Sequence, residues 1–258
     1  MNGVVELGLL QMAAAYLLLV AVGIVMRIYK IDQLKILTVA SMRMTIQLIL
    51  AGLILCYIFD NESRMLTAVY LLAMIVFTVI RVLSKFRDLN PAFKRSVGLS
   101  IGVSGLFVIA YFVCIVVGED ILNPQYAIPI AGMLMGNTMN AVSLGVKTFT
   151  ESLDGKRMEI NALMCSGASS DVILRPFVRQ SMATAMLPTM NSMIGMGIVF
   201  LPGMMTGQIL AGIMPTTAIL YQIAIMAGIC AVVCGSAFGA LHFGSRTMYD
   251  KQTQIITY

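Results

Sequence analysis

The chain has 258 residues, of which 59% are hydrophobic and only 11% are charged, whereas soluble domains carry roughly 25% charged residues. This composition excludes a soluble domain and indicates an all-α integral membrane protein with one transmembrane domain over residues 1–258. The net charge of +5 does not indicate nucleic-acid binding, because the basic residues lie in short clusters between apolar segments.

Seven stretches are long and apolar enough to cross a bilayer, which takes about 20 helical residues. When these stretches cross the membrane in turn, 15 of the 17 basic residues lie on the same side of it. Of the other two, Arg64 lies on the opposite side and Arg43 lies inside a span. The positive-inside rule then predicts an outside N-terminus, a cytoplasmic C-terminus and a multi-pass plasma-membrane protein, in the inner membrane if the source is bacterial. The predicted spans are 4–26, 36–59, 65–83, 97–117, 126–146, 181–201 and 216–241.

The second span carries Arg43 and Gln47 one helical turn apart. A charge at membrane depth costs at least a few kcal/mol, so we expect Arg43 to face the bundle interior, a cavity or the inner interface. If Arg43 lined a transport path, its positive charge would repel cations. The favoured role is therefore structural, with Arg43 bonded to carbonyls near the cytoplasmic end, while Gln47 is a candidate path residue.

The fifth span contains three helix-weakening residues and two amides. Pro129, Gly132 and Gly136 predict an interrupted helix, which is tolerated at membrane depth only where protein or a cavity satisfies the backbone. Asn137 and Asn140 stand three residues apart on one helical face, where their amides could replace the hydration of a polar cargo. Hydrogen bonding between helices remains the alternative for both.

The cytoplasmic loop 147–180 is the longest polar segment. From Met158 to Ser169, apolar residues recur at helical spacing before Gly167, which predicts a short amphipathic helix ended by glycine. Such a helix could transmit force from a partner, because the chain has no nucleotide-binding motif of its own. A helix lying passively on the membrane surface is the alternative.

No recognisable catalytic motif is present. The sequence has neither a phosphate-binding GxxxxGK[ST] loop nor HExxH, and its single histidine, His242, follows the last span. We therefore expect the chain itself not to be an enzyme. The 22 methionines could bind soft metal ions or could simply pack, so no metal site is assigned.

Residues 201–215 carry no charge, two prolines and three glycines. They predict a re-entrant or kinked element at the outer face, where Thr206 and Gln208 could contact cargo or close a gate. A hydrophobic turn packed on the bundle is the alternative. The residues that shape the element are Pro202, Gly203, Gly207, Gly212 and Pro215.

Four sequence blocks resemble one known family, the permease subunits of FetB-type ABC transporters, which include bacterial iron-export and plant aluminium-tolerance permeases. The blocks are AIPIAGMLMGNTMNAVSL (127–144), GAS (167–169), the Leu-Pro and Asn-Ser pairs around Asn191, and LPGMMTGQILAGIMPTTAILYQI (201–223). The resemblance covers essentially the whole chain. Residues 166–168 are Ser-Gly-Ala where family members often have Leu-Gly-Ala.

The resemblance implies a half-transporter that pairs two copies of this chain with two separate ATP-binding subunits, which would hold ATP and Mg. The predicted cytoplasmic helix would be the coupling element, and Asn191 joins the candidate path residues. The expected activity is ATP-driven export of iron or a related metal; another cargo such as a sugar nucleotide, a partner-independent channel or carrier, and a membrane scaffold remain alternatives. The implied coupling residues are Glu159, Leu163, Gly167, Ala168 and Ser169.

Overall fold

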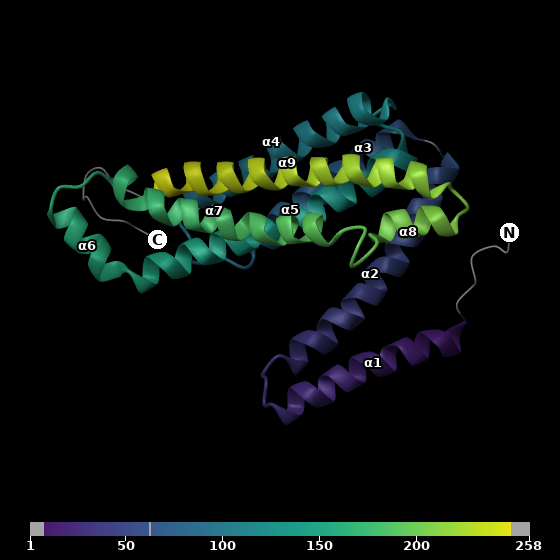
Figure 1. Ribbon diagram of the computed structural model, residues 1–258, viewed down its shortest axis with the longest axis horizontal. Coiled ribbons are helices and arrows are strands. Elements are labelled where there is room, and N and C mark those ends of the chain that lie inside the picture. The colour runs from purple at the N-terminus through teal and green to yellow at the C-terminus, as the bar shows by residue number, and fades with distance from the viewer. Residues whose placement is uncertain (1–7, 62, 249–258) are drawn as a thin grey trace. The chain divides into compact units, whose positions relative to one another are not determined.

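A computed structural model describes residues 8–61 and 63–248, and within these ranges it contains helices and no strand. The predicted all-α class is confirmed. The described residues form two compact units, one made of 8–61 and 207–213 and the other of 63–206 and 214–248 (Figure 1). The elements are α1 (Leu9–Ile28), α2 (Leu34–Asn61), α3 (Arg64–Leu83), α4 (Pro91–Tyr111), the π-helix η1 (Phe112–Val117), α5 (Pro124–Gly155), α6 (Arg157–Cys165), α7 (Ser170–Gly195), α8 (Gly203–Leu210) and α9 (Pro215–Thr247).

Five of the described helical segments are long and apolar enough to cross a membrane. They are Leu10–Ile28, Leu34–Asn61, Arg64–Leu83, Pro91–Val117 and Pro215–Thr247. The other two predicted spans fall on α5 and α7, which have 32 and 26 residues but carry more polar side chains. Five of the seven predicted spans thus coincide with helices that are long and apolar enough to cross a membrane. The full count of seven stays a prediction.

The predicted end of the sixth span is wrong. The sequence predicted a helix to residue 201, but α7 ends at Gly195. Gly197 then adopts a φ of 82°, in the left-handed region that glycine tolerates, and its N–H donates to the carbonyl of Phe200 at 3.0 Å. A tight turn therefore replaces the last residues of the predicted helix.

The predicted interruption of the fifth span is also wrong, because α5 is continuous from Pro124 to Gly155. Pro124 starts the helix, where its missing N–H costs nothing, and the Asn123 side chain accepts a hydrogen bond from the Gln125 N–H at 3.2 Å. Pro129 lies inside the helix and removes one backbone hydrogen bond, at a cost of about 3 kcal/mol. Burial of neighbours such as Ala127, Ile130 and Leu134 offsets that cost.

A cluster of buried apolar side chains joins six helices of the second unit, α3, α4, α5, α6, α7 and α9, near one end. Phe93 of α4 stacks on Phe149 of α5 with 6.1 Å between ring centroids. The Asn90 amide donates to the carbonyl of Thr247 at 3.4 Å, which ties the α3–α4 loop to the end of α9. The basic loops of this unit therefore share one end, as the charge pattern predicted.

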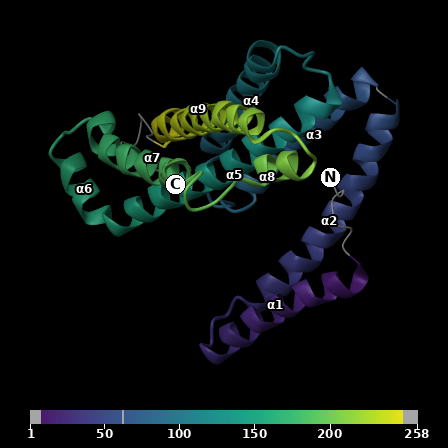
Figure 2. The ribbon, with the colours of Figure 1, turned by 45° about the vertical axis from the view of Figure 1, so that its right-hand side comes forward.

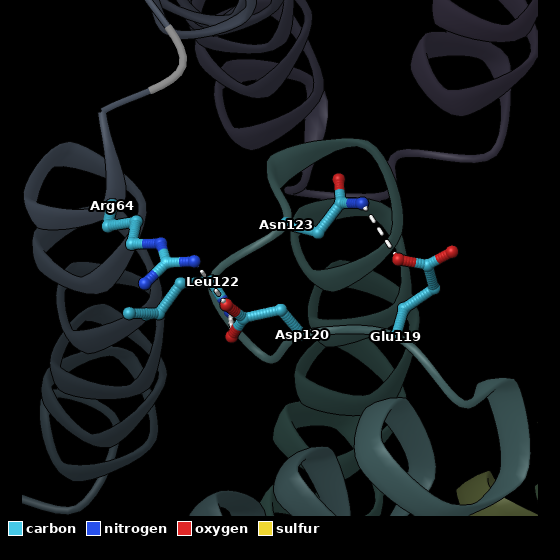
Figure 3. A network of polar contacts seen from close by, with 5 residues as sticks. All are labelled: Arg64, Glu119, Asp120, Leu122 and Asn123. Atoms are coloured by element: carbon cyan, nitrogen blue, oxygen red, sulfur yellow. Dashed lines mark hydrogen bonds and ion pairs between the residues drawn. The ribbon is translucent and has the colours of Figure 1, made fainter.

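The opposite end of the same unit carries an acidic loop between η1 and α5 (Figure 3). Arg64, at the start of α3, lies 3.3 Å from the carboxylate of Asp120, and the Asn123 amide donates to Glu119 at 3.2 Å. These exposed pairs contribute little to stability. They connect the start of α3 with the loop that leads into α5.

Small residues bring α4 and α9 into close contact. A Cβ built on Gly239 would lie 2.5 Å from the Oγ and 2.8 Å from the Cβ of Ser100, and one built on Gly235 would lie 3.1 Å from the Oγ of Ser104. Such spacing lets helix backbones approach closely. The pair Gly235 and Gly239 thus packs within the second unit, against Ser104 and Ser100 of α4.

We expect Gly239→Ala to destabilise the protein, because overpacking of this kind costs roughly 1–3 kcal/mol. The measurement is the thermal midpoint of the detergent-solubilised chain. Gly102→Ala is the matched control, since nothing lies within 4 Å of its Cβ position and alanine favours a helix over glycine by about 1 kcal/mol. Equal midpoints for the two variants would contradict the close α4–α9 contact.

Candidate functional site

The predicted cytoplasmic helix is present as α6, Arg157–Cys165. Its first turn holds two exposed ion pairs, Lys156 with Glu159 at 3.0 Å and Arg157 with Asp154 at 2.8 Å. Ile160 is 2% exposed and belongs to the apolar cluster, so one face of α6 is anchored in the core.

The end of α6 is fixed by Gly167, as the sequence predicted. Gly167 has a φ of 81°, its N–H donates to the carbonyl of Met164 at 3.0 Å, and the N–H of Ala168 donates to that of Leu163 at 3.1 Å. This pair of bonds is a Schellman motif, which requires a left-handed residue at the position of Gly167. Ser169 then caps α7, its carbonyl accepting from Val172 at 3.0 Å.

The other side of α6 is open. Met158 is 89% exposed and Leu163 is 41% exposed, although both are apolar. Figures 1 and 2 show α6 at the end of the second unit, bridging the end of α5 and the start of α7. An anchored helix with exposed apolar side chains at the tip of a bundle has the form of a docking surface.

The candidate path residues of α5 lie on one uncovered face. Gly136, Asn137, Asn140 and Pro129 are exposed, and Gly132 is half-buried. The Asn137 amide donates to the carbonyl of Met133 at 2.8 Å, within its own helix. Asn140 has no hydrogen bond within 8–61 and 63–248. Both amides stand near the middle of a helix of 32 residues, about 48 Å long at 1.5 Å per residue.

Asn191 of α7 is also exposed. The two antiparallel helices touch where a Cβ on Gly145 would lie 3.0 Å from the Cβ of Ala185. Counting back along α5 and forward along α7 from this contact, at equal rise per residue, places Asn137 and Asn191 at about the same level. The second unit therefore presents three exposed amides at similar depth on two packed helices.

The predicted outer element is a short helix between two breaks. α8 begins after Pro202 and ends at Leu210, Gly212 has a φ of 92°, and Pro215 starts α9. The Thr206 hydroxyl donates to the carbonyl of Pro202 at 3.1 Å, and the Oε1 of Gln208 is buried without a partner among the described residues. A Cβ on Gly203 or Gly207 would meet nothing within 4 Å. The element is thus a short helix between two breaks, while its place at the outer face and the role of Thr206 and Gln208 stay predictions.

Arg43 and Gln47 lie in the first unit, and both are exposed on α2. Arg43 makes no hydrogen bond to a backbone carbonyl in the part of the chain that the structure describes, so the expected structural bond is not seen.

Sequence reasoning missed a cavity of about 300 Å³ between the start of α7 and the end of α9. Arg246 lies 3.9 Å from Asp171, and His242 stacks on Phe238 with 5.0 Å between ring centroids. Arg175 also lines the cavity. No local motif could reveal it, because its walls come from segments about seventy residues apart in the sequence.

These features define a multi-pass, all-α membrane protein with a short helix that exposes apolar side chains at one end of its second unit and with exposed amides on α5 and α7. The model of the uncharacterised protein family UPF0014 matches residues 9–249, and the chain belongs to this family. UPF0014 membrane protein slr1647 of Synechocystis is 36% identical over 191 residues, covering 72% of this chain and 73% of that protein.

Two further relatives carry more informative names. "Probable iron export permease protein FetB" of Escherichia coli is 31% identical, covering 83% of this chain and 82% of that protein. "Protein ALUMINUM SENSITIVE 3" of Arabidopsis thaliana is 27% identical, covering 84% of this chain and 78% of that protein. No solved structure matches the chain.

We expect Gly167→Ala to loosen α6, because a left-handed conformation costs a residue with a Cβ about 1–2 kcal/mol. Hydrogen exchange of the amides of residues 157–169 should quicken about fivefold or more, and Gly167→Asn should have a smaller effect. Gly155→Ala is the control, since that glycine also has open space around its Cβ position but no left-handed φ. Unchanged exchange in Gly167→Ala would contradict the Schellman assignment.

Proposed function

We propose that this chain is the membrane permease of an ABC transporter that exports iron or a related metal, energised by a separate ATP-binding subunit. Two copies of the chain would form the membrane part, and ATP and Mg would bind to the partner, so the chain itself is not the enzyme. The family, and a relative named as an iron export permease, support this function. A plasma-membrane location agrees with it.

The observation that carries the proposal is the position of α6. It is the direct covalent link between α5, which bears Asn137 and Asn140, and α7, which bears Asn191. Its core residue Ile160 packs in the same cluster as Phe149 of α5 and other side chains from α7. A partner that displaces α6 therefore moves both helices that carry the exposed amides, which is what alternating access requires.

The exposed amides fit a path better than a lipid-facing surface. An amide in hydrocarbon without a partner is costly, so this face must be covered by protein or line a cavity. In a pair of copies, amide oxygens from both chains would become available to the cargo. Oxygen is also the ligand that hard cations such as Fe³⁺ and Al³⁺ prefer.

We expect Met158→Asp to uncouple the transporter reconstituted with its ATP-binding subunit. A charge replaces an exposed apolar side chain at the docking surface, and an acidic residue in the first turn of α6 should not disturb the helix itself. The ratio of metal transported to ATP hydrolysed should fall several-fold. Val172→Asp is the control, because Val172 is likewise apolar, exposed and in the first turn of a helix; an equal fall in both variants would argue against docking at α6.

We expect Asn137→Ala and Asn140→Ala to alter cargo-stimulated ATP hydrolysis by about tenfold while the thermal midpoint stays within 2 °C of the parent, since both side chains are exposed. Gln125→Ala removes an exposed amide from the first turn of the same helix and should change neither quantity. A thermal midpoint lowered by more than about 2 °C in the asparagine variants, with cargo stimulation unchanged, would show that the amides only hold helices together.

A further inference from the structure

The first unit contains a hairpin of α1 and α2 with a narrow seam. Tyr16, Leu19 and Gly23 of α1 are half-buried, as are Leu37 and Ser41 of α2, while most other side chains of both helices are exposed. The hydroxyls of Tyr16 and Thr45 are hydrogen-bonded and tie the helices together at one level. The two helices thus touch along a narrow line of half-buried residues.

A trough of about 490 Å³ follows this seam from Tyr16 to Arg27 on α1 and from Leu34 to Met42 on α2. The α2 hydroxyls that line it are satisfied within their own helix, because Ser41 donates to the carbonyl of Leu37 at 2.6 Å and Thr38 to that of Lys35 at 3.0 Å. The trough therefore presents hydrocarbon and no free donor along its α2 wall, a surface suited to an apolar chain.

The trough opens at one end into a basic cup. A second cavity of about 680 Å³ shares Arg27 and Leu34 with the trough and is also lined by Lys30, Asp32 and Lys35. Within 8–61 and 63–248, none of these three cations forms an ion pair, and they outnumber the single carboxylate. Lys30 has a φ of 51° because it ends α1 in a Schellman motif, in which its N–H donates to the carbonyl of Arg27 at 3.2 Å and the N–H of Ile31 donates to that of Met26 at 2.9 Å.

The length of the trough matches one leaflet of a bilayer. From Tyr16 to Arg27 a helix rises about 16 Å, and half of a hydrocarbon core of about 30 Å is 15 Å. In a hairpin that spans the bilayer with its basic end at one interface, the cup would lie at headgroup level and the Tyr16–Thr45 bond near the midplane.

We propose that the α1–α2 hairpin binds one anionic glycerophospholipid, with an acyl chain in the trough and the phosphate in the cup of Arg27, Lys30 and Lys35. Neither cavity alone specifies this ligand. An apolar trough accepts many hydrophobic partners, and a basic cup accepts any phosphate. Their continuity through Arg27 and Leu34, at one leaflet's length, selects a molecule that has both parts.

The test uses the full-length chain in detergent, titrated with phosphatidylglycerol or phosphatidylcholine and followed by native mass spectrometry. The parent should retain phosphatidylglycerol about tenfold more tightly than phosphatidylcholine. The triple variant R27Q/K30Q/K35Q should lose this preference, because it removes the three cations of the cup. The control R175Q/R179Q/R246Q has the same net charge as the first variant and should keep the preference for phosphatidylglycerol. If both triple variants lost this preference equally, the effect would come from net charge alone, and the proposal would be overturned.

The acyl part is tested by filling the trough. Ser41→Phe should weaken retention of both lipids about tenfold, and Thr38→Phe serves as a second variant should the first alter helix content or thermal midpoint. Glycerol phosphate, which has the headgroup and no acyl chain, should not displace the lipid. Displacement by glycerol phosphate, or full lipid retention in folded Ser41→Phe or Thr38→Phe, would show a simple phosphate site and refute the lipid assignment.

Discussion

Hydrocarbon offers no hydrogen-bond partner, so every polar group of a membrane helix must find one within the protein, and this constraint shapes most of the structure. Hydroxyls along the spans donate to the carbonyl four residues earlier, as Thr78 does to Met74 and Thr138 to Leu134, both at 2.8 Å. The exceptions are informative. The exposed amide of Asn140 is one of them, and it lies on the face that we assign to transport.

The two units differ in how much of their surface they bury and in where their polar side chains lie. The α1–α2 hairpin buries little of itself; Ser41 and Thr38 bond to their own helix, and the cations Arg27, Lys30 and Lys35 gather at one end. The second unit instead buries one end in a shared apolar cluster, where Phe93, Phe149 and Ile160 are each at most 2% exposed. The hairpin thus has no core of its own, whereas the second unit has one.

Local rules in the sequence predicted the elements that depend on few residues. Hydropathy located most spans, and Gly167 predicted the end of α6 because a Schellman motif needs only that residue and its neighbours. Packing decided the rest. Pro129 weakens a helix locally, yet α5 continues because its buried side chains outweigh one missing hydrogen bond. The contact of Gly239 with Ser100 and the cavity beside His242 join distant segments, and no local pattern encodes them.

The close contact of α5 with α7 adds a mechanical step to the proposed function. A Cβ on Gly145 would lie 3.0 Å from the Cβ of Ala185 and 3.5 Å from the carbonyl of Ser181, so the two backbones are in close contact there. This point is ten residues, or about 15 Å, from the α6 end of α5 and roughly 8–12 Å from the amides on its other side. On the proposed mechanism it acts as a fulcrum. Force applied at α6 that draws the near ends of α5 and α7 together would separate their far halves, where Asn137 and Asn191 lie at one level, so docking at one end is converted into opening at the other.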